Sequence, residues 1–118
     1  MTDWRTMLRK ETLEQLLANA REQAPLKGTR RERDFEPVCK LFNPTGAGTW
    51  LITECDEDGL AFGLADLGYP ELGYVSMDEL AELKGLAGLG IEEDRRWKAT
   101  KTLSQYADEA RRLGYIRP

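Results

Sequence analysis

Short apolar runs separated by turn residues fill the middle of the chain, between positions 37 and 76. The breaks between the runs are Asn-Pro, Gly-x-Gly, Asp-Gly and Tyr-Pro, and these residues favour turns. Runs of this kind with such breaks are typical of strands that are joined by short hairpins. The middle of the chain is therefore predicted to be an antiparallel meander.

An apolar stripe at helical spacing precedes the meander. It predicts a helix over residues 10–24, because Pro25 disfavours helical geometry in the residue before it. An N-terminal arm, residues 1–9, comes before this helix, and a basic linker, residues 25–36, follows it. The stripe consists of Leu13, Leu16, Leu17 and Ala20.

Further elements are predicted after the meander. Ser76 opens a capping box at the start of a short helix over residues 77–84. Thr102 is predicted to cap a closing helix over residues 102–113, and a last strand is predicted within residues 91–98. No internal repeat occurs.

These elements predict one α+β domain. It has an antiparallel meander sheet of three to five strands, with N- and C-terminal helices packed on it. Asp58 and Gly59 suit a two-residue type I′ turn, which would pair Cys55 with Phe62 and put Cys55 on the same face as Leu51. Apolar side chains occur on both faces of this hairpin, so we expect both faces to be covered.

The amino-acid composition limits which catalytic and metal-binding sites the protein can contain. Apolar residues make up 41% of the chain and charged residues 32%, as in ordinary globular proteins. No histidine is present, which removes the commonest general base and the commonest metal ligand. Cys39 and Cys55 stand in strand-like runs, so we expect buried, reduced thiols. We expect no metal and no cofactor.

The location of the protein is predicted from what its sequence lacks. The first ten residues contain no apolar stretch of the kind found in secretory signals. No apolar run approaches the roughly 18 residues that a membrane span needs. A cytoplasmic protein without membrane contact is therefore expected.

Charge is unevenly distributed along the chain. Residues 54–94, called the acidic segment below, hold 12 acidic residues and one basic residue, whereas the net charge of the whole chain is −4. If the fold keeps the two charge types apart, the protein has surfaces of opposite potential.

Our leading hypothesis is a non-enzymatic interaction protein that docks an acidic, aromatic-bearing face on a protein partner. Acidic surfaces can occupy grooves that bind nucleic acid, so a host-defence complex would be a suitable partner. Aromatic side chains on a turn that is rigidified by proline would anchor the contact. The residues predicted to form this face are Asp56, Glu57, Asp58, Asp66, Tyr69, Glu71 and Tyr74.

An alternative hypothesis is a DNA-binding accessory protein with two basic clusters. Their side chains would contact phosphates, and Trp4 or Trp97 would stack on bases. The acidic balance of the whole chain argues against this alternative, because nucleic-acid-binding domains are typically basic. The residues concerned are Lys27, Arg30, Arg31, Arg33, Arg95, Arg96 and Lys98.

A third alternative is a small hydrolase or nuclease with a carboxylate-bound metal, and it has the least support. Asp56, Asp58 and Gly59 match the start of a calcium loop, but Leu67 stands at its twelfth position, where a bidentate glutamate belongs. The glycine-rich residues 43–49 lead into a strand, whereas a phosphate loop leads into a helix. No spacing singles out a pair of carboxylates, so no catalytic residue is assigned.

Several blocks of the sequence resemble an uncharacterised family of small proteins, called domain of unknown function 2958. The resemblance implies a setting in plasmids, phages and integrative elements, and it implies neither a reaction nor catalytic residues. The basic linker is not a feature that we associate with the family. The matching blocks are Lys40–Glu54, Gly59–Leu80 and Gly88–Asp94, with Glu11–Asn19 and Lys101–Ala107 outside them; Gly-Thr-Trp-Leu and Pro-Glu-Leu-Gly-Tyr-Val-Ser are the most specific parts.

Overall fold

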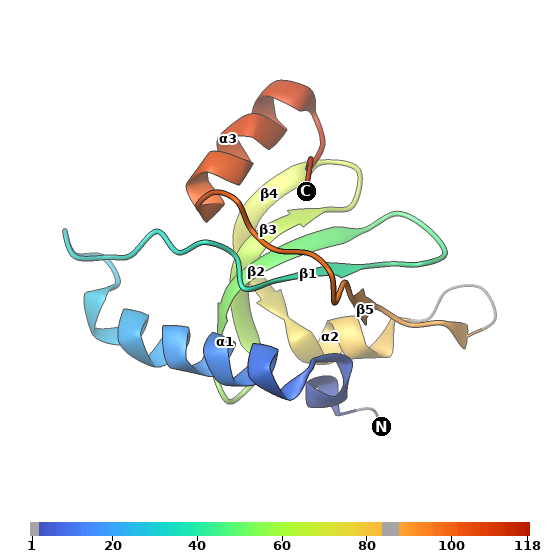
Figure 1. Cartoon of the computed structure of the whole chain (residues 1–118), viewed down its shortest axis with the longest axis horizontal. Helices are drawn as coiled ribbons and strands as arrows, with labels where there is room; N and C mark the ends of the chain where they lie inside the picture. Colours follow the sequence, from blue (N-terminus) through green and yellow to red (C-terminus); the bar gives the residue numbers. More distant parts are fainter. Residues whose placement is uncertain (1–2, 84–87) are drawn as a thin grey trace.

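A five-stranded antiparallel sheet forms the centre of the computed structural model (Figure 1). Its strands lie in the order β4-β3-β2-β1-β5. This order confirms the α+β class and the antiparallel meander from β1 to β4. The structure describes residues 3–83 and 88–118. The strands are β1 (Cys39–Phe42), β2 (Thr49–Cys55), β3 (Leu60–Asp66), β4 (Pro70–Ser76) and β5 (Glu92–Glu93).

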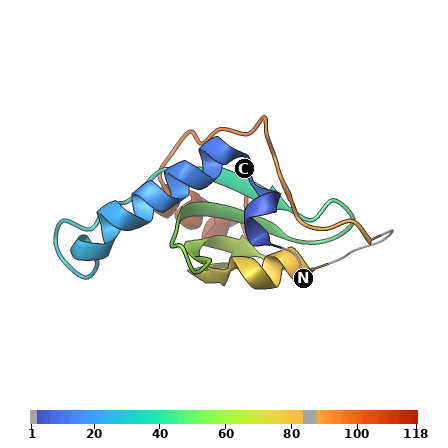
Figure 2. The same cartoon turned by 90° about the horizontal axis from the view of Figure 1, so that it is seen from below.

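Helices cover both faces of the sheet, with α1 on one face and α3 on the other (Figures 1 and 2). The predicted helices at the two ends of the chain are confirmed within one residue. Within the described ranges, no helix is long and apolar enough to cross a membrane. The helical elements are η1 (Trp4–Met7), α1 (Lys10–Gln23), η2 (Ala24–Leu26), α2 (Met77–Glu82) and α3 (Leu103–Leu113).

Two predicted elements after the meander are shorter in the structure. α2 ends at Glu82, where Leu83 turns to an extended conformation; the predicted end at residue 84 lies outside the described residues. The strand predicted within residues 91–98 is reduced to the two residues of β5, which pair with β1. The C-terminal helix matches closely, because Thr102 and Gln105 form a complete capping box.

The β2–β3 turn differs from the predicted two-residue turn. Residues 56–59 form it, and Cys55 pairs with Ala61 instead of Phe62. The carboxylate of Asp56 accepts hydrogen bonds from the N–H groups of Asp58 and Leu60, both at 2.9 Å. Such an Asx turn holds a longer loop, which is why the Asp-Gly pair alone predicted the wrong register.

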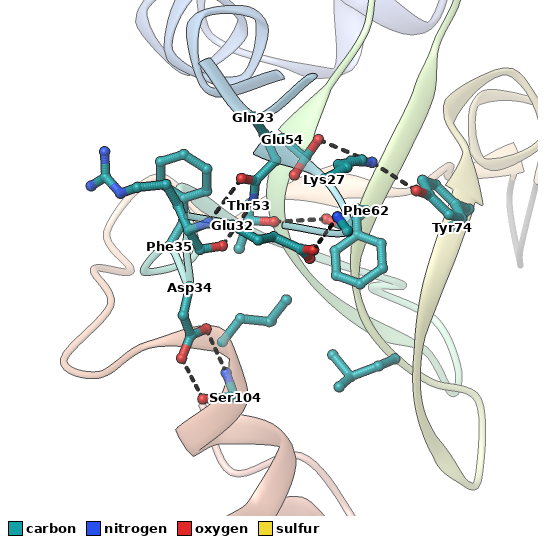
Figure 3. A pocket seen from close by; sticks show the side chains of 14 residues that line it. Gln23, Lys27, Glu32, Asp34, Phe35, Thr53, Glu54, Phe62, Tyr74 and Ser104 are labelled. Atoms are coloured by element: carbon teal, nitrogen blue, oxygen red, sulfur yellow. Dashed lines mark hydrogen bonds and ion pairs between the residues drawn. The ribbon is translucent and has the colours of Figure 1, made fainter. Parts of the chain in front are cut away.

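A bulge in β2 reassigns side chains between the two faces. The register shifts between Ile52 and Glu54, so Cys55 joins the core beneath α1 and not the face of Leu51. Bulges insert one residue into a strand and reverse the alternation beyond it. As a result, Glu54 lies on the α3 side of the sheet, beside Phe62 and Tyr74 (Figure 3).

Helix α1 is rotated relative to the face that its apolar stripe predicted. Leu16 is fully buried, whereas Leu13 and Leu17 are only partly buried. Polar residues complete the buried line of the helix because each has a partner. The Asn19 amide donates to the Thr53 carbonyl oxygen at 2.9 Å. The buried residues of α1 are Thr12, Leu16, Asn19 and Gln23.

Candidate functional site

Five of the seven residues predicted to form one acidic, aromatic face lie at opposite ends of β3, and the other two, Glu71 and Tyr74, lie along β4. The β2–β3 turn carries Asp56, Glu57 and Asp58, and the opposite turn lies near Asp66 and Tyr69. Because β3 has seven residues, the two turns are roughly 20 Å apart. The fold therefore does not bring these side chains together on one continuous face.

Acidic residues of the acidic segment are paired with basic residues from the rest of the chain. Lys27 contacts Glu54 at 3.6 Å, and Lys40 contacts Asp94 at 3.5 Å. Arg9 binds Glu93 at 3.0 Å. These ion pairs reduce the separation of charge that the sequence predicted.

The two basic clusters lie in different parts of the molecule. The linker that holds Arg30 and Arg31 reaches one end of the long axis, while β5, which precedes Arg95 and Arg96, lies toward the other end (Figure 1). Arg33 forms an ion pair with Glu22 at 2.6 Å.

Neither tryptophan that was considered for base stacking stands free. Trp4 is buried in the core, and Trp97 packs against Tyr106 with 5.9 Å between ring centroids. Lys98, after Trp97, belongs to the same exposed segment as Arg95 and Arg96. DNA binding through these clusters stays a prediction.

A cavity of about 530 Å³ lies on the α3 side of the sheet, under the basic linker (Figure 3). This volume is in the range of small-molecule and side-chain binding sites. Its walls come from the end of α1, the linker, strands β2 to β4 and the start of α3. The residues that line it include Gln23, Lys27, Glu32, Asp34, Phe35, Glu54, Phe62, Leu72, Tyr74, Leu103 and Ser104.

Lys27 is the central polar group of this cavity. Its Nζ donates to the Tyr74 hydroxyl at 2.7 Å and lies 3.6 Å from a carboxylate oxygen of Glu54 (Figure 3). The same ammonium lies 4.6 Å from the centroid of the Tyr74 ring and 5.8 Å from that of Phe62. Such contacts attract a cation to the ring face. Lys27 thus ties the linker to strands β2, β3 and β4.

Burial sets the protonation behaviour of this group of side chains. It raises the pKa of Glu54, although the charge of Lys27 lowers it in part. Burial lowers the pKa of Lys27, but the hydrogen bond to Tyr74 and the charge of Glu54 outweigh this effect, so the pKa is raised overall. Glu54 is not among the site residues predicted from the sequence. A single acid between Thr53 and Cys55 in an apolar strand was the available signal.

The linker is fixed at two further points. The Gln23 side-chain amide donates to the carbonyl oxygen of Arg33 at 2.7 Å and accepts from the N–H of Arg33 at 2.9 Å. Asp34 accepts from the N–H of Ser104 at 3.1 Å and from its hydroxyl, at the start of α3. Burial raises the pKa of Asp34, but these hydrogen bonds outweigh it and lower the pKa. The linker is therefore a built wall of the cavity.

The prediction of buried cysteines is confirmed. Cys39 and Cys55 are free and buried, and burial raises the pKa of Cys55 to about 12 and that of Cys39 further. Both thiols are therefore protonated and weakly nucleophilic at neutral pH. In the described part of the chain, no group of three potential ligand side chains converges on a point where a metal ion would bind.

The open edge of β4 lies next to the cavity. β4 is the last strand in the order of the sheet, and among the described residues it pairs only with β3. Leu72 and Tyr74 line the cavity and are also 39% and 58% exposed. In the adjoining turn, Leu67 is 64% exposed and Tyr69 is 72% exposed. Large apolar side chains thus gather along the outer edge of β4.

The main-chain groups at this edge can be assigned. The N–H of Met77 donates to the carbonyl oxygen of Gly59 at 2.8 Å, which continues the register between β3 and β4. Hydrogen-bonded and non-bonded pairs alternate in an antiparallel ladder. The N–H and C=O groups of Gly73 therefore form hydrogen bonds to β3. Those of Leu72 and Tyr74 point away from β3, toward the open edge of the sheet.

Comparisons with known proteins give a family and no function. No curated protein matches the chain, and no solved structure matches it. One family model, described as protein of unknown function DUF2958, matches residues 7–117. Since this match covers nearly the whole chain, the protein belongs to the family of unknown function DUF2958.

Proposed function

We propose that the protein is a non-enzymatic interaction protein that binds an extended segment of a partner protein at the outer edge of β4. The observation that carries this proposal is the seven-residue edge strand, with outward main-chain groups at Leu72 and Tyr74. An added strand gains affinity from main-chain hydrogen bonds and specificity from pockets beside the edge.

The cavity supplies the second element of such a site. Side chains of an added strand alternate between the two faces of the sheet, so every second one would extend toward the cavity side. There, Leu72 and Tyr74 offer apolar surface, and Glu32 offers a carboxylate on an exposed residue. A partner residue with an apolar stem and a basic end suits this lining.

This proposal changes the leading hypothesis in one respect. The partner contact relies on β4, with Tyr69, Glu71 and Tyr74 from the predicted set, and does not use residues 56–58 of the β2–β3 turn. The mobile-element setting and the defence-complex partner extend the proposal, and identification of the partner tests them.

Site-specific photo-crosslinking tests the binding surface directly. A photoreactive benzoylphenylalanine replaces Tyr69 or Tyr74 in cells of the native host. Glu14, which is exposed on α1 and lies on the opposite side of the sheet from the cavity, receives the same group as a control. We expect adducts from positions 69 and 74, not from 14, and the same adduct with purified partner. Equal labelling from all three positions, or none from β4, would contradict the proposal.

A further inference from the structure

The outer edge of β4 is complementary to itself. When two copies pair antiparallel about Gly73, Leu72 of each copy faces Tyr74 of the other. These are the residues whose N–H and C=O groups point outward, so each pair exchanges both main-chain hydrogen bonds. A pair centred on Leu72 would instead set Tyr74 against Pro70, which has no N–H to donate.

The side-chain pairs that this register creates are also favourable. Leu72 and Tyr74 form apolar–aromatic cross-strand pairs on the cavity side, which stabilise paired strands. On the other side Glu71 faces Val75, so no like charges are opposed. Gly73 faces Gly73 at the centre, and a side chain there would meet no atom of its own chain within 4 Å. The centre of the edge thus has room for a side chain on this face of the sheet.

We propose that the isolated protein is a two-fold dimer in which β4 pairs with β4 of a second copy and joins two sheets into one. The inference rests on the proposed function, because it uses the same edge. A foreign partner that adds a strand to β4 must then displace the second copy. Dimer and partner complex are mutually exclusive, and the two cavities of the dimer border the shared strands.

Charge reversal at Gly73 tests the two-fold register. Gly73 is not in the left-handed region, so Gly73→Asp and Gly73→Lys are compatible with the monomer fold. In the dimer each puts like charges face to face, about 4.5 Å apart at the Cα atoms. Analytical ultracentrifugation should show a wild-type dimer, at least about tenfold weaker association of either variant, and a restored dimer when the two are mixed.

A cysteine at the same position gives a positive signal that does not depend on repulsion. Facing Gly73→Cys residues would lie within disulfide range, while the native thiols are buried. Mild oxidation should yield a covalent dimer of Gly73→Cys and not of Tyr115→Cys. A monomeric wild type at all concentrations, an Asp–Lys mixture that stays monomeric, or no covalent dimer would overturn the inference.

Failure of the dimer and failure of the proposed function give different results. A monomeric protein that still forms crosslinks from positions 69 and 74 to another protein overturns the dimer alone. A monomer without such crosslinks overturns both. A dimer that persists in both charge variants uses another surface, and it also overturns the inference.

Discussion

The two edges of the sheet differ in how they are protected. β5 has two residues, both glutamates, and Glu93 is tied to Arg9 and Thr12. A short, charged edge strand resists pairing with other chains. β4 has seven residues with exposed Leu72 and Tyr74. The comparison indicates that the edge at β5 is closed by the fold itself, whereas that at β4 is left available.

The largest expected effect on stability is that of a substitution at Gly63, and a substitution at its cross-strand neighbour Gly73 is the comparison. A Cβ at Gly63 would lie 2.1 Å from the carbonyl oxygen of Leu51, which is main chain, while a Cβ at Gly73 meets nothing within 4 Å. Gly63→Ala should lower the free energy of unfolding by about 3 kcal/mol or more, and Gly73→Ala by less than about 0.5 kcal/mol. Urea denaturation measures both, and equal losses would contradict the contrast between interior and edge strands.

The next largest loss of stability is expected when the Glu93 carboxylate at the β5 edge is removed. Glu93 is 2% exposed in its side chain and accepts from the Arg9 N–H at 2.9 Å and the Thr12 hydroxyl at 2.7 Å. Glu93→Ala leaves both donors without an acceptor, so we expect a loss of about 2–3 kcal/mol. Thermal unfolding of Glu93→Ala is compared with that of Glu92→Ala, the exposed neighbour, which should be nearly neutral. Similar melting temperatures for the two variants would show that Glu93 does not hold α1 to this edge.

The meander and terminal helices could be predicted because local chemistry determines them. The capping box at Thr102 and the proline after α1 act within a few residues, and the sequence displays such signals directly. The wrong register at Cys55 arises at the turn, where the Asp56 carboxylate holds a loop longer than two residues. The bulge between Ile52 and Glu54 lies where a distant residue makes contact, since the Asn19 amide donates to the Thr53 carbonyl oxygen, and the sequence does not display such non-local contacts.

The candidate site could be predicted only in part for the same reason. Tyr69, Glu71 and Tyr74 were identified because a proline-containing turn with aromatic residues is visible in the sequence. Glu54 and Lys27 are 27 positions apart in the chain, and only the path of the linker brings them together. Net charge by segment does not show which acids receive partners from elsewhere in the fold, as Glu54, Glu93 and Asp94 do.

A smaller effect is expected at the turn that adjoins the open edge. Asp66 accepts from the N–H of Gly68 at 2.8 Å and from that of Ile116 at 3.0 Å, and so ties the β3–β4 turn to the C-terminal segment. Asp66→Ala should cost about 1 kcal/mol. Chemical denaturation of Glu71→Ala, an exposed acid on the same hairpin, is the control and should change little. An equal loss in both variants would mean that charge, not these two hydrogen bonds, sets the stability of this turn.

The smallest effect is a pH dependence at the cavity beside β4. Burial raises the pKa of Glu54 above its ordinary value of 4.5, so the folded protein binds this proton more tightly than the unfolded chain. The stabilisation is complete below the unfolded pKa and is lost as the pH rises through the folded pKa. Glu54→Gln should therefore lose less stability than the wild type as the pH rises from about 4 to 7.

Asp34→Asn provides a control of opposite sign for this measurement. The pKa of Asp34 lies below its ordinary value of 3.8, so its stabilisation is present above that value and is lost as the pH falls. Urea unfolding across the pH range should then give a shallower decline above pH 4.5 for Glu54→Gln and a shallower decline in acid for Asp34→Asn. If Glu54→Gln kept the wild-type slope, the Glu54 carboxylate would be hydrated rather than buried. The cavity wall beside β4 would then be open to water at the point where the proposed partner's basic side chain is expected to enter.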